Sequence, residues 1–334
     1  MPKILLVKTS SMGDVIHNLP MVSDIRRHFP DSQIHWVVEE AFQAIPAMHS
    51  GVSKIITVAL RRWRKTLWKA HTWKELADFF KRLRSERYDF ILDSQGLIKS
   101  ALIARLAKGG KRCGLGRGSA RESMPFLYDQ VFDIPWTLHA VQRTRSLAAQ
   151  ALGYSPEGNA DYGISATPAV FQWLKPPYAV LLHSSSDENK LWPEINWVEL
   201  GARLHQYGLA CILLWGSKNE RERSDRLARR IEQAVVEHMA VPPRLDLNDA
   251  ASLLAGAEVV IGVDTGLTHL AAALGVPVVG IYCASSPEET GIYSDNAVNL
   301  GGINQQPAVD AVAAAVDKLL AAHPDFPSPL MGEG

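Results

Sequence analysis

The residue types best suited to chemistry lie in short polar turns that follow apolar runs. The first turn, residues 8–15, reads Lys-Thr-Ser-Ser-Met-Gly-Asp-Val and includes Ser10, Gly13 and Asp14. Asp14 near the start of a helix could accept hydrogen bonds from free backbone N–H groups, or it could act as a general base, which typically raises a rate by about 10²–10⁴-fold. Gly13 would let a ligand approach the backbone closely. The residues alone leave both roles of Asp14 open.

A second polar turn spans residues 183–193 and contains Ser185, Ser186 and Lys190. Hydroxyl groups and a lysine between a strand end and a helix start could bind a phosphate, although many serine-rich turns have no such role. Glu220 lies in another such turn, where it could bind a ribose diol or simply begin a surface helix.

Residues 263–269, Val-Asp-Thr-Gly-Leu-Thr-His, form the most specific of these turns. The N–H groups of Thr265 and Gly266 at a helix start, together with the positive end of the helix dipole, suit a diphosphate. Asp264 could then accept a sugar hydroxyl. The structural alternative makes Asp264 a helix cap and His269 an ordinary helix residue.

Residues 61–69 read Arg-Arg-Trp-Arg-Lys-Thr-Leu-Trp-Lys and combine charge with aromatic rings. Tryptophan favours the membrane interface, and each basic residue near an anionic surface contributes about 1 kcal/mol. The same side chains could bind phosphates or carboxylates of an anionic acceptor, or form a solvated basic face. The acceptor-binding candidates are Arg61, Arg62, Arg64, Lys65 and Arg121.

Apolar runs that alternate with amphipathic segments predict β–α–β units on parallel sheets, which bind ligands at the carboxyl ends of their strands. In the first half we expect strands near 4–7, 34–38, 55–59 and 89–93, with helices near 15–28, 73–86, 97–107 and 139–151. In the second half we expect strands near 178–183, 210–215, 259–263 and 277–282, with helices near 194–206, 219–233, 248–255, 267–274 and 308–321.

A chain of 334 residues is long enough for two domains. We predict an α/β protein with two doubly wound, Rossmann-like domains that face a central cleft. The expected boundaries are a first domain at 1–160, a linker at 161–177 rich in turn residues, a second domain at 178–322 and a frayed tail at 323–334. The last helix could pack back on the N-terminal domain.

Composition and charge exclude several classes of protein. Apolar residues make up 47% of the chain, which argues against disorder. Residues 1–165 carry 24 basic and 15 acidic residues, a net charge of +9, whereas the remainder carries 11 and 20, a net charge of −9; the first half therefore suits an anionic partner. Three scattered cysteines, no signal peptide and no apolar run of membrane-spanning length favour the cytoplasm. The chain has no Asp-x-Asp for a metal-bound diphosphate and no Gly-x-Gly-x-x-Gly after the first strand for NAD, so we expect neither metal nor cofactor.

Taken together, the motifs resemble the ADP-heptose-dependent heptosyltransferases, a bacterial glycosyltransferase family of GT-B fold. The resemblance spans most of the chain in family order, and the first turn is similar to that of the type I members. It rests on residues 8–15, Val37-Val38-Glu39-Glu40, residues 61–65, Asp93-Ser94-Gln95-Gly96-Leu97 and residues 263–269.

The resemblance implies inverting, metal-independent transfer of L-glycero-D-manno-heptose from ADP-heptose, a co-substrate, to the Kdo residue of Kdo-lipid A in lipopolysaccharide inner-core synthesis. Asp14 would be the base, and Lys190 with the 265–266 N–H groups would hold the leaving diphosphate. The other implied donor contacts are Ser185 and Ser186 to phosphate, Glu220 to ribose, Leu245 near adenine, and Asp264 and His269 to heptose and phosphates. Ser10, Gly13 and the basic candidates would bind the acceptor. The implied location is cytoplasmic, peripheral to the anionic inner-membrane surface.

Three other functions remain as alternatives. A sugar-nucleotide epimerase or hydrolase, or another heptosyltransferase subtype, could use the same paired sheets, but an epimerase or hydrolase would not need the basic segment. A two-domain solute-binding protein would normally carry a secretory signal. We expect no nucleic-acid partner, because no helix-turn-helix or RNA-binding signature is present and the second half is acidic.

Overall fold

The computed structural model describes residues 1–122, 124–234 and 239–322. The chain divides into two compact units between Ile164 and Ser165, which lies inside the expected linker. Residues 154–177 contain neither helix nor strand. The predicted tail at 323–334 falls outside the described residues. The cleft expected between the two sheets stays a prediction.

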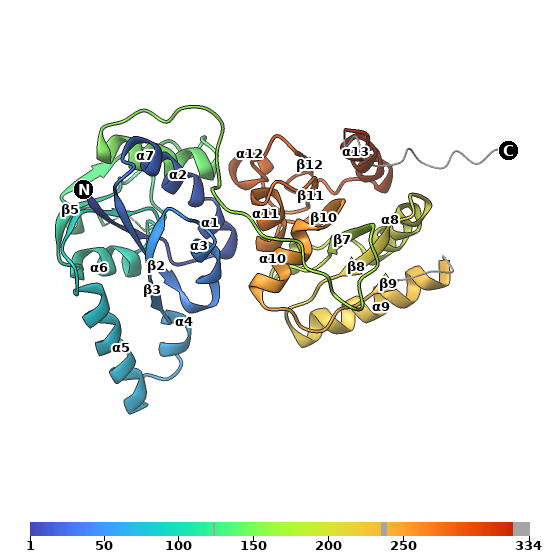
Figure 1. Cartoon of the computed structure of the whole chain (residues 1–334), viewed down its shortest axis with the longest axis horizontal. Helices are drawn as coiled ribbons and strands as arrows, with labels where there is room; N and C mark the ends of the chain where they lie inside the picture. Colours follow the sequence, from blue (N-terminus) through green and yellow to red (C-terminus); the bar gives the residue numbers. More distant parts are fainter. Residues whose placement is uncertain (123, 235–238, 323–334) are drawn as a thin grey trace. The chain divides into compact units, whose positions relative to one another are not determined.

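The N-terminal unit contains a six-stranded parallel sheet with strand order β3-β2-β1-β4-β5-β6 (Figure 1). Its central strands are apolar and buried on both faces, as parallel strands between helices require. The strands are β1 (Lys3–Val7), β2 (Gln33–Glu39), β3 (Val52–Val58), β4 (Tyr88–Asp93), β5 (Gly109–Leu115) and β6 (Gln130–Phe132).

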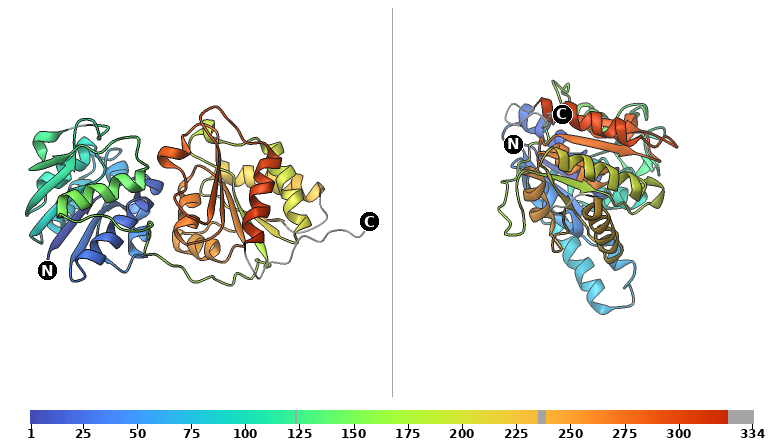
Figure 2. Two further views of the ribbon diagram at one scale, coloured as in Figure 1. Left: turned by 90° about the horizontal axis from the view of Figure 1, so that it is seen from above. Right: turned by 90° about the vertical axis from the view of Figure 1, so that its right-hand side faces the viewer.

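Helices cover this sheet on both faces (Figure 2). Apolar residues of α5 and α6 pack against Leu5 and Val7 of β1, while α2 and α7 pack against each other. The helices are α1 (Met12–Ile16), α2 (Leu19–His28), α3 (Ala44–Ala47), α4 (Leu60–Trp63), α5 (Ala70–Leu83), α6 (Ile98–Leu106) and α7 (Ala140–Leu152), with single 3₁₀ turns η1 (Glu40–Phe42) and η2 (Pro125–Leu127).

The C-terminal unit repeats this topology with strand order β12-β11-β10-β7-β8-β9. Its strands are β7 (Tyr178–Leu182), β8 (Ala210–Leu213), β9 (Met239–Ala240), β10 (Val259–Val263), β11 (Val278–Tyr282) and β12 (Ala297–Gly301). Its helices are α8 (Glu194–Gln206), α9 (Lys218–Ala234), α10 (Leu247–Ala255), α11 (Gly266–Ala273), α12 (Pro287–Thr290) and α13 (Val309–Ala321), with the 3₁₀ turn η3 (Glu188–Lys190).

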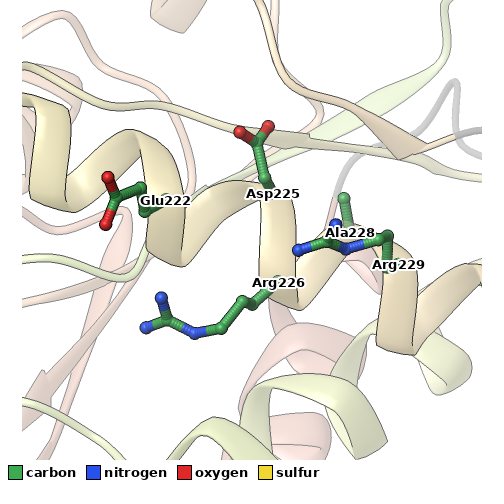
Figure 3. Close-up of a pocket in the computed structure, with 5 residues that line it drawn as sticks. All are labelled: Glu222, Asp225, Arg226, Ala228 and Arg229. Atoms are coloured by element: carbon green, nitrogen blue, oxygen red, sulfur yellow. The ribbon is translucent and has the colours of Figure 1, made fainter.

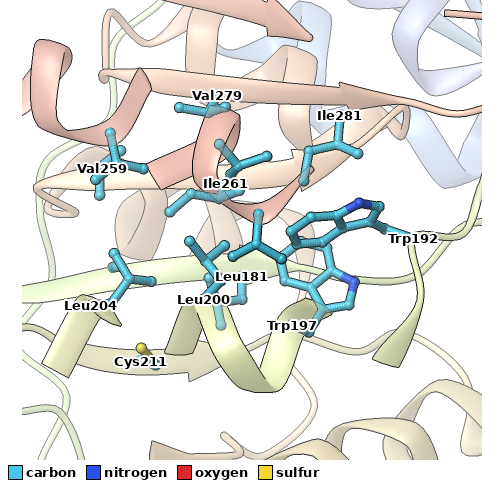
Figure 4. Close-up of a cluster of buried hydrophobic side chains, with 14 of the residues drawn as sticks. Leu181, Trp192, Trp197, Leu200, Leu204, Cys211, Val259, Ile261, Val279 and Ile281 are labelled. Carbon is cyan, nitrogen blue, oxygen red and sulfur yellow. The ribbon is translucent and has the colours of Figure 1, made fainter. Parts of the chain in front are cut away.

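The core of the C-terminal unit fixes the segment that carries Lys190. Trp192 and Trp197 are fully buried with their ring centroids 5.2 Å apart at nearly a right angle, among strand residues such as Leu181 and Ile261 (Figure 4). The Trp192 indole N–H also donates to the Pro307 carbonyl at 3.0 Å. The segment that follows Lys190 in the chain is therefore fixed in the core by Trp192 and Trp197.

Both sheets have a topological switch point, the position where the strand order changes direction. It lies between β1 and β4 in the N-terminal unit and between β7 and β10 in the C-terminal unit. Ligands of open α/β sheets bind beyond the carboxyl ends of such strands. The turns at residues 8–15 and 263–269 follow β1 and β10, so the structure places both predicted turns at switch points.

The structure corrects several expected elements. Four strands at or next to a sheet edge, β5, β6, β9 and β12, were not expected, and the single helix predicted at 15–28 is two helices because Pro20 begins a new one. The short helices α3, α4 and α12 were also missed. Helix α13 contacts α8 and strands β10 to β12 of its own unit, and its packing on the N-terminal unit stays a prediction. Among the described residues, no helix combines the length and apolar character needed to cross a membrane.

Candidate functional site

The turn after β1 is held by the turn after β4, the neighbouring strand. The backbone N–H groups of Thr9 and Ser10 both donate to Gln95 Oε1, at 2.9 and 3.1 Å. The Gln95 oxygen thus accepts two backbone hydrogen bonds at the start of the turn, as a backbone carbonyl oxygen could. Ser10, Gly13 and Asp14 therefore share one short segment whose conformation depends on Gln95.

A buried carboxylate in turn orients Gln95. Asp93 is fully buried, and its Oδ1 accepts the N–H groups of Gln95 and Gly96 at 2.8 and 3.3 Å. Its Oδ2 accepts the Tyr128 hydroxyl at 2.8 Å. Burial raises the pKa of Asp93 despite these hydrogen bonds, which favour the charged form. Hydrogen bonds therefore run from Tyr128 through Asp93 and Gln95 to the turn and fix its conformation.

Asp14 lies in the first turn of α1, where Ser11 rather than Asp14 is the N-cap. Its Oδ2 accepts the backbone N–H of Ser11 at 2.9 Å and the Ser11 hydroxyl at 2.8 Å, and its Oδ1 lies 3.6 Å from Lys8 Nζ. The carboxylate thus has part of the structural role considered from the sequence. Its side chain is still 35% exposed, so a ligand hydroxyl can reach it.

The surroundings of Asp14 favour its charged form. Burial acts to raise its pKa, but the charge of Lys8, the two Ser11 hydrogen bonds and the charge of His17 outweigh burial and lower the pKa below its ordinary value. Asp14 is therefore ionised at neutral pH, as a base must be.

The basic segment begins at α4 and is fixed by acidic residues at the end of β2, in η1 and in α5. The Arg61 backbone N–H donates to the buried Glu39 carboxylate at 3.1 Å. The Arg62 guanidinium forms a two-point ion pair with Glu40, at 3.0 Å for each bond, and another with Glu75 at 2.8 Å. Arg62 is thus already engaged, and binding an anionic ligand there requires it to exchange a carboxylate.

The remaining acceptor-binding candidates are exposed, but they lie on two separate segments. Arg64 and Lys65 lie just after α4, whereas Arg121 lies in the loop between β5 and β6. Glu122 ties that loop to the 96–98 turn, because its N–H donates to the Gly96 carbonyl and its carboxylate accepts the Ile98 N–H. These hydrogen bonds hold the neighbouring Arg121 close to the turn that carries Gln95.

The C-terminal unit gathers the predicted diphosphate residues around one carboxylate. Asp264 Oδ2 accepts Lys190 Nζ at 2.6 Å and the Ser285 hydroxyl at 2.7 Å, and its Oδ1 lies 3.3 Å from His269 Nε2. These side chains come from η3, from the turns that follow β10 and β11, and from α11. We call Lys190, Asp264, His269 and Ser285 the Asp264 centre.

Asp264 is nearly buried and fully paired within this centre. Burial acts to raise its pKa, but the hydrogen bond and charge of His269 and the hydrogen bonds from Lys190 and Ser285 lower it below the ordinary value. Thr265, not Asp264, is the N-cap of α11, so the capping role considered for Asp264 is wrong. Thr265 and Gly266 are half-exposed at the helix start.

A cavity of about 800 Å³ lies beside η3 and the loops that follow β11 and β12. Asp187, Asn189, Cys283 and Asn304 are among the residues that line it. Ser185 is half-exposed, with its hydroxyl accepting the Asp187 N–H at 3.4 Å, and Ser186 is exposed. Both serines lie on the segment that leads to Lys190.

Glu220 lies in the first turn of α9, which follows β8, and Leu245 lies in the loop that follows β9. Glu220 Oε2 accepts the N–H groups of Gly216 and Ser217 at 2.7 and 2.8 Å, so in the free protein Glu220 has the helix-start role considered from the sequence. The Trp215 indole donates to the Pro242 carbonyl at 2.8 Å, which brings these two loops together. Leu245 lies in the second loop and is half-buried.

The sequence reasoning assigned no role to Lys8, Gln95 or Ser285. Lys8 and Gln95 belonged to recognised motifs, but their contacts require knowing that β1 and β4 are neighbours. Ser285 follows an expected strand and was recognisable as a hydroxyl at the ligand-binding edge of a sheet. A further pocket, shown in Figure 3, is lined by Glu222, Asp225, Arg226, Ala228 and Arg229 of α9 and includes no predicted site residue.

Comparisons with known proteins show which family and which solved structures the chain is similar to. The model of glycosyltransferase family 9 (heptosyltransferase) matches residues 62–318. Over 301 residues, the chain is 46% identical to lipopolysaccharide heptosyltransferase 1 of Pseudomonas aeruginosa, covering 90% of this chain and 83% of that protein. The structure of E. coli heptosyltransferase WaaC with ADP superposes with a TM-score of 0.85 at 38% identity, covering 95% of this chain and 99% of that one. The same enzyme with ADP-2-deoxy-2-fluoro heptose gives a TM-score of 0.80 at the same identity and coverage.

Proposed function

This chain belongs to glycosyltransferase family 9, the heptosyltransferases, and from that premise we propose that Asp14 and the Asp264 centre supply its catalytic groups. The chain is a GT-B glycosyltransferase that transfers heptose in the assembly of the lipopolysaccharide inner core. The observation that carries the catalytic proposal is the gathering of Lys190, His269 and Ser285 on Asp264 at the switch point of the second sheet.

The proposed donor is ADP-L-glycero-D-manno-heptose, a choice supported by the E. coli structures solved with ADP and with an ADP-heptose analogue. Lys190 and the N–H groups of Thr265 and Gly266 would stabilise the negative charge that develops on the diphosphate, at about 3–4 kcal/mol for each well-aimed donor. In binding the diphosphate, Lys190 would share its charge between phosphate and Asp264. The remaining donor contacts would come from Ser185, Ser186, Glu220, Leu245 and His269.

The proposed acceptor is the Kdo residue of Kdo-lipid A. Its hydroxyl oxygen would attack the anomeric carbon of heptose while the bond from that carbon to the diphosphate breaks. The proton passes to Asp14 and the electron pair leaves on ADP, so a single displacement inverts the anomeric configuration. Ser10 and Gly13 border the base. The exposed Arg61, Arg64, Lys65 and Arg121 would bind anionic groups of the acceptor, and Arg62 would do so by exchanging a carboxylate.

We propose that these fixed donors replace a divalent ion and that the enzyme acts at the cytoplasmic surface of the inner membrane. The test mixes the protein with ADP-heptose and Kdo-lipid A in excess EDTA and follows ADP release. We expect full activity and, by NMR of the product, an inverted anomeric centre. An absolute requirement for a divalent ion, or a retained configuration, contradicts the mechanism. Conversion of the donor without acceptor would instead indicate an epimerase or hydrolase.

A further inference from the structure

An exposed apolar tip lies where α4 joins α5. The exposed fractions are 47% for Leu67, 77% for Trp68 and 61% for Trp73, and we call these three residues the tip. Figure 1 and the right-hand view of Figure 2 show α5 extending beyond the first sheet, with its connection to α4 at the free end. Exposed apolar side chains grouped among polar ones mark interaction surfaces.

The tip is held in place by hydrogen bonds beneath it. Thr72 is fully buried, and its hydroxyl donates to the Thr66 carbonyl at 2.8 Å and lies 3.0 Å from the Thr66 hydroxyl. The Trp73 indole N–H donates to the Leu67 carbonyl at 2.9 Å. The loop therefore presents its rings without a large loss of conformational entropy on binding. Because the Trp73 N–H already has an acceptor within the protein, moving this ring out of water would leave no unpaired donor.

The charge around the tip has one sign. Residues 61–74 contain six lysines and arginines and no aspartate or glutamate. Within the described part of the chain, Arg62 is the member of this group that forms ion pairs, with Glu40 and Glu75. The other five are exposed: Arg61, Arg64, Lys65, Lys69 and Lys74. Tryptophan and leucine surrounded by exposed cations suit the headgroup region of an anionic bilayer.

We propose that the tip inserts into the interface of an anionic phospholipid bilayer while the surrounding cations bind lipid phosphates. The inference rests on the proposed function, since an acceptor carried on lipid A is presented at a membrane surface. It goes beyond that function by separating two tasks of one segment. Arg61, Arg64 and Lys65 bind anionic groups, whether of the acceptor or of the surrounding lipids. Leu67, Trp68 and Trp73 insert into the apolar part of the bilayer interface.

The test measures co-sedimentation of the full chain with vesicles of phosphatidylcholine, with and without phosphatidylglycerol, in the absence of donor and acceptor. We expect binding to the anionic vesicles to exceed binding to neutral ones and to weaken with salt. The double variant Trp68→Ala/Trp73→Ala should bind anionic vesicles about tenfold more weakly. Trp68→Phe/Trp73→Phe should keep most of the binding because it keeps two apolar rings. Trp136→Ala, which removes a partly exposed tryptophan outside the tip, is the matched control and should bind like the wild type.

Three results would overturn the proposal. They are wild-type protein that does not bind anionic vesicles, an alanine variant that binds them as well as the wild type, and a phenylalanine variant that binds them as weakly as the alanine variant. A shift from dimer to monomer in the alanine variant would also overturn it, since the tip would then join two copies of the chain. With a deacylated, water-soluble acceptor, the alanine variant should turn over at the wild-type rate. Failed vesicle binding with normal turnover removes the docking surface and leaves heptose transfer intact.

Discussion

The neighbours of Asp14 lower the pKa of its carboxyl group, so the carboxylate stays ionised but is a weaker base. Lys8 lies 3.6 Å from one carboxylate oxygen, and Ser11 donates two hydrogen bonds to the other. This arrangement keeps the base ionised but weakens its affinity for a proton. Lys8 itself is nearly buried and donates to the Ser94 carbonyl at 3.2 Å, so its ammonium group stays beside the carboxylate.

We predict that Lys8→Met shifts the pH dependence of catalysis. Removing the ammonium group raises the pKa of Asp14, so protonation inactivates the base at a higher pH. The acid limb of the kcat/KM profile should therefore move to higher pH. Lys54→Met, which removes a half-exposed lysine of the same unit, is the control and should leave the limb in place. An unshifted limb in Lys8→Met would show that Asp14 is not the group that titrates.

Gln95 is expected to position the base without touching substrate. Gln95→Leu removes the acceptor shared by the Thr9 and Ser10 N–H groups, and the turn that carries Asp14 should loosen. We expect kcat to fall about tenfold or more, since small displacements of a catalytic group have large effects. The KM for ADP-heptose should stay unchanged, because the proposed donor groups belong to the other unit. Gln95→Glu keeps an oxygen acceptor and should recover most of kcat; equal loss in both variants would contradict the positioning role.

Residue types at strand ends were sufficient to predict Asp14, Lys190 and Asp264 as candidates. Their partners were not predictable in this way. The Gln95 contact joins residues more than 80 positions apart, and Ser285 reaches Asp264 only because β10 and β11 are neighbours. The structure also shows that Glu220 caps its own helix, one of the two roles that the sequence left open, and that Arg62 pairs with Glu40 and Glu75, partners that the sequence did not indicate.

At the scale of elements, the apolar strands were predictable, including the edge strand β3, whereas β5, β6, β9 and β12, at or near the other edges, were not. β5 begins Gly-Gly-Lys-Arg and β12 contains Asn299 and Gly301, compositions that do not favour strands. Such segments become strands because a neighbouring strand supplies hydrogen-bond partners. Likewise, Pro20 marks the break between α1 and α2, but the apolar periodicity continues through it and masked the boundary.

The contact between α2 and α7 depends on a buried ion pair. Arg145 donates to both oxygens of Asp24, at 2.7 and 3.0 Å, and both side chains are almost fully buried. Arg145→Met would remove both hydrogen bonds from the buried Asp24 carboxylate and leave it beside the more exposed Arg27 guanidinium, 3.7 Å away. We predict a loss of about 3–5 kcal/mol in the free energy of unfolding, measured by urea denaturation.

The double variant Asp24→Leu/Arg145→Met provides the control for this prediction. It removes both charges, and it should recover most of the lost stability because no unpaired charge remains. If the single variant unfolds at the wild-type urea concentration, the pair does not hold α2 against α7.

At the scale of the whole molecule, charge and chemistry divide along the same boundary. The positive half of the sequence contains Asp14 and the basic acceptor-binding candidates, and the negative half contains the Asp264 centre. Motif order along the chain was enough to recognise the family and its paired sheets. The approach of the two units during transfer remains a prediction, because it depends on contacts that neither unit makes alone.

The most direct test of the account is the turnover of Asp14→Asn. Asparagine can still accept the Ser11 hydrogen bonds, so the variant removes the base while keeping the turn. We predict that kcat falls by about 10²–10⁴-fold, with the KM for ADP-heptose within about twofold of wild type, and that Asp31→Asn, at an exposed carboxylate, is unaffected. Near-normal kcat in Asp14→Asn would contradict the assignment of Asp14 as the base.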